Sequence, residues 1–103
     1  MIYNTAMTDT NPIRIDYSDA CMRVLVEEYI TQQRSAFTFK GVCSYVLYWA
    51  MEDGKVADQG TLCEGNELPP YEQERIKRIL AAIVKDGRIA ATGIDAFTKI
   101  LNA

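Results

Sequence analysis

The residues of this chain with the most capacity for covalent or metal chemistry are three cysteines and a few adjacent carboxylates. The number of cysteines is odd, and none of them has the C-x-x-C spacing of a metal or redox site: they are Cys21, Cys43 and Cys63. We therefore expect buried, reduced thiols, two of them on apolar helical faces, in a reducing compartment. Glu27-Glu28 and Glu52-Asp53 are neighbours in sequence, a pattern typical of a solvated helix face rather than of a paired acid and base.

Histidine is absent from the sequence, which removes the commonest general base and the commonest zinc ligand. It also removes every Ser-His or Cys-His nucleophile pair. The glycines follow helical patterns instead of forming a phosphate-binding loop. We expect a protein without enzymatic activity, metal or cofactor.

Charge is distributed very unevenly along the chain, whose net charge is −3. Residues 1–74 contain five Lys and Arg against twelve Asp and Glu, whereas residues 75–103 contain six Lys and Arg against two Asp. A local excess of basic side chains on one element is the usual electrostatic footprint of a nucleic-acid surface. The six basic residues of this tail are Arg75, Lys77, Arg78, Lys85, Arg88 and Lys99.

The first 32 or so residues predict an arm followed by a helix. Residues 1–16 lack a sustained period and form the arm, either disordered or with a short strand at Ile13–Ile15. Ser18 is a suitable N-cap for a helix over about 18–33. Its apolar face follows the i, i+3, i+4 rule: Met22, Leu25, Val26, Tyr29 and Ile30.

A second helix follows a polar break, with Thr38 as its cap and an apolar face from Phe39 to Met51. Phe37 and Phe39 alternate, so this segment either forms a short strand or enters the helix directly. Tyr45, Tyr48 and Trp49 widen the apolar belt beyond one stripe. Such an aromatic stripe is more typical of core or of a packed partner interface than of a base-stacking platform.

A third helix is predicted to begin at Pro69-Pro70, where proline suits the first turn, and to end at Gly87. Residues 55–68 between the second and third helices indicate a loop. After Gly87, Arg88–Ala91 and Phe97–Leu101 indicate a hairpin around the turn formers Gly93 and Asp95. A terminal helix from Asp95 is the rival interpretation.

A short phrase occurs twice, as "MEDGKVA" at residues 51–57 and "VKDGRIA" at residues 84–90. Each copy predicts the end of a helix, a glycine that accepts the left-handed conformation, and an apolar residue that returns to the core. Two copies are too few for a solenoid. The repeat therefore indicates two equivalent helix ends.

The order helix, short strand, helix, helix, glycine stop and hairpin resembles the winged-helix (winged helix-turn-helix) family. The segment "RIKRILAAIVKDGRIAATG" followed by "AFTKIL" is similar to the end of the third helix and the wing of that family. The resemblance implies an α+β fold over residues 17–103, with three helices and a C-terminal β-hairpin. In this family the third helix enters the major groove and the wing contacts the backbone. By position, the resemblance implies DNA contacts at Gln73, Arg75, Lys77, Arg78, Arg88 and Lys99.

Two functional hypotheses follow. The first is a small DNA-binding protein, such as a transcriptional regulator, that contacts double-stranded DNA through the third helix and the wing, with its basic side chains turned to solvent. The second is a non-enzymatic interaction module in which Tyr45, Tyr48 and Trp49 form a homodimer or contact another protein. The acidic front, residues 1–74, would then be turned towards a basic partner.

No apolar run approaches the roughly 18 residues that cross a bilayer, and the start of the chain is polar. We expect a cytoplasmic protein without a membrane partner.

Overall fold

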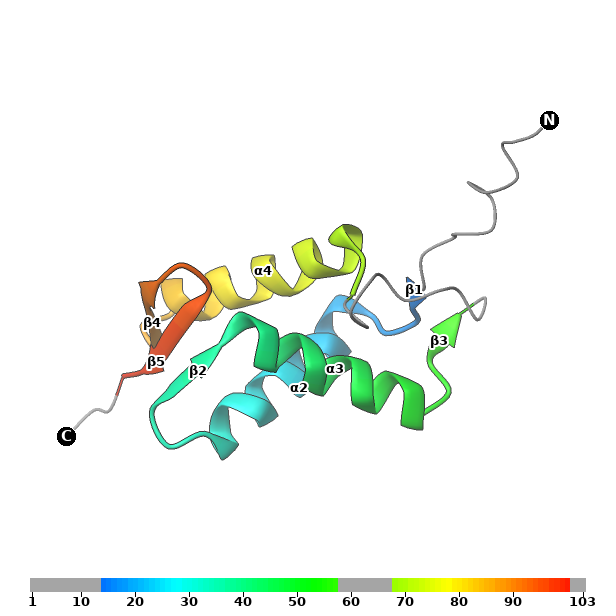
Figure 1. Ribbon diagram of the computed structural model, residues 1–103, viewed down its shortest axis with the longest axis horizontal. Helices are drawn as coiled ribbons and strands as arrows, with labels where there is room; N and C mark the ends of the chain where they lie inside the picture. The colour runs from blue at the N-terminus through cyan, green and yellow to red at the C-terminus, as the bar shows by residue number, and fades with distance from the viewer. Residues whose placement is uncertain (1–13, 58–67, 101–103) are drawn as a thin grey trace.

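Three helices pack around one core in a computed structural model that describes residues 14–57 and 68–100. Helix α4 lies above α2 and α3 in the view of Figure 1 and packs against both, with a hairpin at one end of the molecule and a pair of very short strands at the other. The described fold is therefore mixed α+β, as the sequence predicts. The elements are β1 (Arg14–Ile15), α2 (Asp19–Gln32), β2 (Ala36–Thr38), α3 (Phe39–Glu52), β3 (Val56–Ala57), α4 (Pro70–Lys85), β4 (Ile89–Gly93) and β5 (Ala96–Lys99).

The starts of α2 and α3 are set by the predicted caps. The Ser18 hydroxyl oxygen accepts a hydrogen bond from the Cys21 N–H at 3.1 Å, and the Thr38 hydroxyl oxygen accepts one from the Gly41 N–H at 3.0 Å. Each bond satisfies a backbone donor that has no intrahelical acceptor. The predicted N-terminal boundaries of both helices are therefore confirmed.

The two predicted glycine stops are confirmed as well. Gly54 has a φ of 67° after α3, and Gly87 has a φ of 80° after α4. This left-handed conformation costs a residue without a Cβ very little, so the chain can reverse direction at both places. Val56 in β3 and Ile89 in β4 then return to the core, and Ile89 is almost fully buried.

The main sheet has the strand order β2-β5-β4, with both pairs antiparallel. Phe37 of β2 lies opposite Phe97 of β5, and their rings stack with centroids 5.5 Å apart. Residues 96–99 form a strand, so the rival interpretation of a terminal helix from Asp95 is wrong. Asp95 occupies the hairpin turn with a φ of 57°, a conformation that Asp tolerates better than most residues.

A second small sheet joins β1 to β3, with Arg14 opposite Ala57 and Ile15 opposite Val56. The predicted strand near residue 14 is thus confirmed for Arg14–Ile15. The predicted loop over residues 55–68 is wrong at Val56–Ala57. Residues 58–67, and residues 1–13 of the predicted arm over 1–16, lie outside the described residues.

Of the three cysteines, Cys43 is buried, as expected for a thiol on an apolar helix face, whereas Cys21 is exposed. The expectation was wrong for Cys21 because the buried face of α2 is narrow and consists of Met22, Val26 and Ile30. Cys63 lies outside the described residues. No helix in the described part of the chain combines the length and the apolar character needed to span a membrane.

Candidate nucleic-acid interface

The predicted DNA-contacting residues of α4 have different environments, and only two of them are exposed. Lys77 and Arg78 lie on the solvent side of the helix, and no carboxylate among the described residues forms an ion pair with either. The Lys77 ammonium lies over the ring of Phe39, 5.3 Å from its centroid. A cation over an aromatic face is stabilised there while it remains accessible to an anion.

The prediction that Arg75 is exposed is wrong, because its side chain is buried among residues of the N-terminal segment. Nη1 donates to the Glu72 Oε1 at 2.9 Å and to the Ile15 carbonyl at 3.2 Å. Nη2 donates to the Tyr17 carbonyl at 2.6 Å, and both Nε and Nη2 donate to the Asp19 Oδ1, at 3.1 and 3.0 Å. A guanidinium has five N–H donors. All of them are used, which leaves none for a phosphate.

Glu72 completes this cluster and is also fully buried. Its Oε2 accepts a hydrogen bond from the Ile15 N–H at 2.9 Å. Burial alone would lower the pKa of Arg75, but the hydrogen bonds to Asp19 and Glu72 outweigh burial and raise it. The Glu72–Arg75 pair therefore fixes residues 15–19 to α4 and serves the fold rather than a ligand.

Gln73 is half-buried, and its Nε2 donates to the Leu68 carbonyl at 2.6 Å. The winged-helix resemblance implies that this side chain contacts DNA. Instead, it stabilises the turn that leads into the helix. A contact with DNA would require the amide to exchange this hydrogen bond for another.

Both basic residues predicted on the hairpin are held by α2 or by the turn that follows it. Arg88 pairs with Glu27 at 3.2 Å, and the Lys99 Nζ donates to the Gln33 carbonyl at 2.9 Å. Glu27 also binds Arg23 at 2.7 Å. The hydrogen bond from Arg23, followed by the charge of Arg88, lowers the pKa of Glu27 against the opposing effect of burial.

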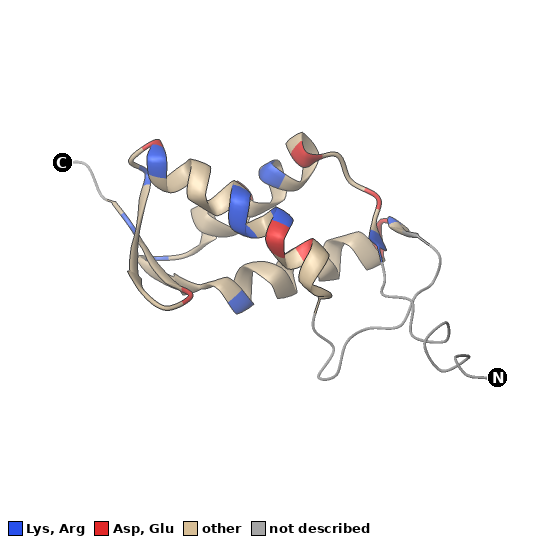
Figure 2. Ribbon diagram, turned by 90° about the horizontal axis from the view of Figure 1, so that it is seen from above, with Lys and Arg blue, Asp and Glu red and all other residues tan. Residues whose placement is uncertain are grey.

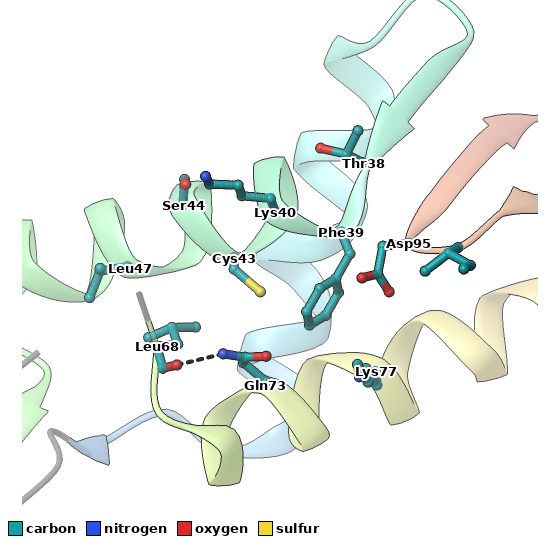
Figure 3. Close-up of a pocket in the computed structure, with 11 residues that line it drawn as sticks. Thr38, Phe39, Lys40, Cys43, Ser44, Leu47, Leu68, Gln73, Lys77 and Asp95 are labelled. Carbon is teal, nitrogen blue, oxygen red and sulfur yellow. Dashed lines mark hydrogen bonds between the residues drawn. The ribbon is translucent and has the colours of Figure 1, made fainter. Parts of the chain in front are cut away.

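The hairpin turn, the start of α3 and the first half of α4 enclose a cavity of about 490 Å³. Figure 3 shows Phe39 and Cys43 of α3 pointing across it towards Gln73 of α4, with Asp95 of the turn beside the Phe39 ring. Lys40 and Lys77 also line the cavity. The turn is fixed there because the Asp95 carbonyl accepts a hydrogen bond from the Phe39 N–H at 2.9 Å.

Lys40 is therefore a basic residue beside the site that was not predicted from the sequence. The available signal was its position directly after Phe39 at the start of a capped helix, since the start of a helix attracts anions. Figure 2, which views the molecule from above, shows Lys and Arg positions along α4 and acidic positions close to its first turn. Of these acidic residues Glu74 is exposed, so an acid precedes Lys77 and Arg78 on the solvent side of α4.

The three aromatic residues predicted as a partner interface lie together on α3. Tyr48 is 56% exposed and Trp49 is 37% exposed, and their rings meet edge to face with centroids 5.3 Å apart. Tyr45 contacts Trp49 and accepts a hydrogen bond from the Gln32 side chain at 3.2 Å. Met51, three positions after Tyr48, is 58% exposed. We call Tyr45, Tyr48, Trp49 and Met51 the aromatic patch.

Among residues 14–57 and 68–100, no group of three or more His, Cys, Asp or Glu side chains is arranged to hold a metal ion. Comparison of the chain with models of known protein families, with curated proteins and with solved structures found no match.

Proposed function

We propose that this chain is a winged-helix domain that binds duplex DNA through α4 and the turn of the β4–β5 hairpin. The observation that carries the proposal is the strand order β2-β5-β4, which joins the strand before α3 to the hairpin after α4. This order brings the hairpin turn beside the start of α3 and the middle of α4, where Lys40 and Lys77 line one cavity. It is the arrangement expected of a wing beside a recognition helix.

The proposed contacts differ from those implied by sequence resemblance. Lys77 and Arg78 remain the main candidates on α4, and Lys40 joins them from α3. Arg88 and Lys99 are secondary, because each would have to leave an interaction with α2 or the following turn. Arg75 is no longer a candidate. Phosphate contacts by Lys and Arg position a protein on DNA without specifying a sequence.

A salt titration with a charge-matched control tests this proposal. Each phosphate contact contributes about −0.9 to the slope of log K against log salt. Removing Lys77 and Arg78 together, as Lys77→Ala with Arg78→Ala, should make the slope for a mixed-sequence duplex less negative by about 1.8. The double variant Arg34→Ala with Lys55→Ala removes the same charge from exposed positions outside the proposed interface. Equal effects of the two double variants would contradict the assignment.

The aromatic patch favours a second candidate function, a protein-interaction module. Exposed Tyr and Trp side chains are enriched at the energetic centres of protein interfaces. Glu28, whose Oε1 lies 3.4 Å from the Tyr45 hydroxyl, and Glu52 flank the patch and suit a basic partner. The two candidates use different surfaces, so a dimer formed through α3 would leave Lys77 and Arg78 accessible. Both candidates are non-enzymatic, and the proposal includes the expected cytoplasmic location and a role as a small transcriptional regulator.

A further inference from the structure

Two cavities meet beside the start of α3. The first, of about 490 Å³, lies between α3, α4 and the hairpin turn, and the second, of about 430 Å³, lies between α4 and the hairpin. Phe39, Lys77 and Asp95 line both. The two cavities therefore adjoin along α4, and we call them together the channel. Each is within the size range of small-molecule sites, roughly 300–1,000 Å³.

The channel has an apolar body and a basic junction. Leu47 and Leu68 line its first part, and Leu80, Val84 and Phe97 line its second part. Lys77 lies at the junction with its ammonium over the Phe39 ring, and Lys40 lines the first cavity. Among the described residues no carboxylate forms an ion pair with either lysine. Among the described residues, Asp95 is the acidic residue that lines the two cavities, against Lys40 and Lys77, so the channel carries a net positive charge.

We infer that this channel binds an amphipathic organic anion. Its carboxylate or sulfonate group would pair with Lys77, and its aromatic or aliphatic body would stack on Phe39 and extend between α4 and the hairpin. Apolar walls with one or two well-placed charges are the usual composition of such sites. Phe39 lines both cavities and its ring lies under the Lys77 ammonium, so the charged and apolar halves of the ligand would meet at this residue. This inference does not depend on DNA binding.

A pair of fluorescent probes with the same rings separates charge recognition from apolar binding. Anilinonaphthalene sulfonate carries the anionic group, and phenylnaphthylamine lacks it. We expect saturable binding of the sulfonate, with an affinity about tenfold higher than that of the neutral probe, a ratio typical of one partly desolvated charge interaction. Lys77→Met should remove this preference, whereas Arg78→Met, which removes a charge from the same helix outside the channel, should retain it.

A steric variant tests the apolar half independently. Ala81 is exposed on α4 and lines the second cavity. Ala81→Trp should fill the channel and weaken the binding of both probes by about tenfold or more, with an unchanged far-ultraviolet circular dichroism spectrum and a cooperative thermal transition that verify the fold. Absence of saturable binding, equal affinity for the two probes, an equal loss in Lys77→Met and Arg78→Met, or unchanged binding by a folded Ala81→Trp variant would each overturn the inference.

Discussion

Two arginines three positions apart on α4 have opposite roles. Arg75 is buried with all five donors used, whereas Arg78 is exposed. Removing one member of a buried ion pair leaves the other charge without compensation and costs about 3 to 5 kcal/mol. We expect Arg75→Met to lower the free energy of unfolding by about 3 kcal/mol and Arg78→Met to change it by about 0.5 kcal/mol or less. Urea denaturation followed by circular dichroism measures both.

A double variant shows whether Glu72 and Arg75 stabilise the fold only through each other's charge or also by binding the backbone of residues 15–17. We call the second role the backbone clamp. Glu72→Met with Arg75→Met removes both charges, a change that is often neutral for a simple buried pair. Here it also removes partners from the Ile15 N–H, the Ile15 carbonyl and the Tyr17 carbonyl. Because unsatisfied buried backbone groups are costly, we expect the double variant to remain destabilised by about 2 kcal/mol or more. Recovery of wild-type stability would refute the clamp.

The lowered pKa of Glu27 predicts a contribution to stability that depends on pH. A carboxyl group whose pKa is lower in the folded state stabilises the fold above its unfolded pKa, about 4.3 for Glu. That contribution is lost as the pH falls through the lower folded value. We expect wild-type stability to fall more steeply between about pH 5 and pH 3 than that of Glu27→Gln. Parallel urea midpoints for the two proteins across this range would contradict the assigned ion pairs with Arg23 and Arg88.

The burial of Arg75 had a signal in the sequence. It lies three residues after Glu72 and four before Ile79, so it shares the helical spacing of the buried face rather than of the exposed one. What the sequence lacks is the identity of its acceptors, because Ile15, Tyr17 and Asp19 are more than 50 residues away. Local spacing can indicate a face, but only tertiary structure supplies the partners.

At the scale of elements, the three helices and the hairpin were predictable because their signals are local. Each boundary is set by residues a few positions away: the caps Ser18 and Thr38, the proline at the start of α4, and the glycines at two helix ends. The pairing of β1 with β3 joins segments about 40 residues apart and is only two residues long. Neither the length nor the spacing of such strands predicts a partner.

The close approach of α2 and α3 depends on Gly41. A Cβ at this position would overlap the Tyr29 hydroxyl oxygen and lie 3.1 Å from the Tyr29 Cζ. The Tyr29 ring is held by contacts with Phe37 and Tyr45, so it cannot move freely. We expect Gly41→Ala to destabilise the protein by about 1 kcal/mol, because an overpacking cost of about 1–3 kcal/mol exceeds the gain in helix propensity.

The effect of Gly41→Ala in the wild-type protein can be compared with its effect in a Tyr29→Phe variant. Tyr29→Phe removes the overlapping oxygen and keeps the ring. In that background the same Gly41→Ala change should be less destabilising than in the wild type, because the closest overlap is removed while the ring carbon 3.1 Å from the Cβ remains. Thermal unfolding of the four proteins forms a double-mutant cycle. Additive effects would show that the helices do not meet through this contact.

At the scale of the whole molecule, the charge separation seen along the sequence is partly cancelled in space. Two of the six basic residues of the tail form ion pairs with acids of the front, Arg75 with Asp19 and Glu72, and Arg88 with Glu27. The segments of opposite charge thus pack against each other. A count of charges by sequence position therefore overestimates the basic surface available to DNA.

The aromatic patch predicts the state of association. If it forms a homodimer, Trp49→Ala should raise the dissociation constant about a hundredfold, which is the effect of a hot-spot truncation of roughly 2–3 kcal/mol. Tyr71→Ala removes another exposed aromatic side chain, from α4, and should leave the dissociation constant unchanged. Light scattering across a dilution series gives the mass of each protein. A wild-type protein that is monomeric throughout the series would exclude the homodimer and restrict the patch to another partner.

The strand order also has a consequence for the time at which the fold can be completed during synthesis. Because β5 lies between β2 and β4, neither of those strands has its neighbour until residues 96–99 have left the ribosome. The three helices are made earlier and can pack first, while the backbone groups of β2 remain an open strand edge. Open edges are sites of erroneous pairing between chains. The last strand of the hairpin therefore limits how long each newly made chain is exposed to aggregation.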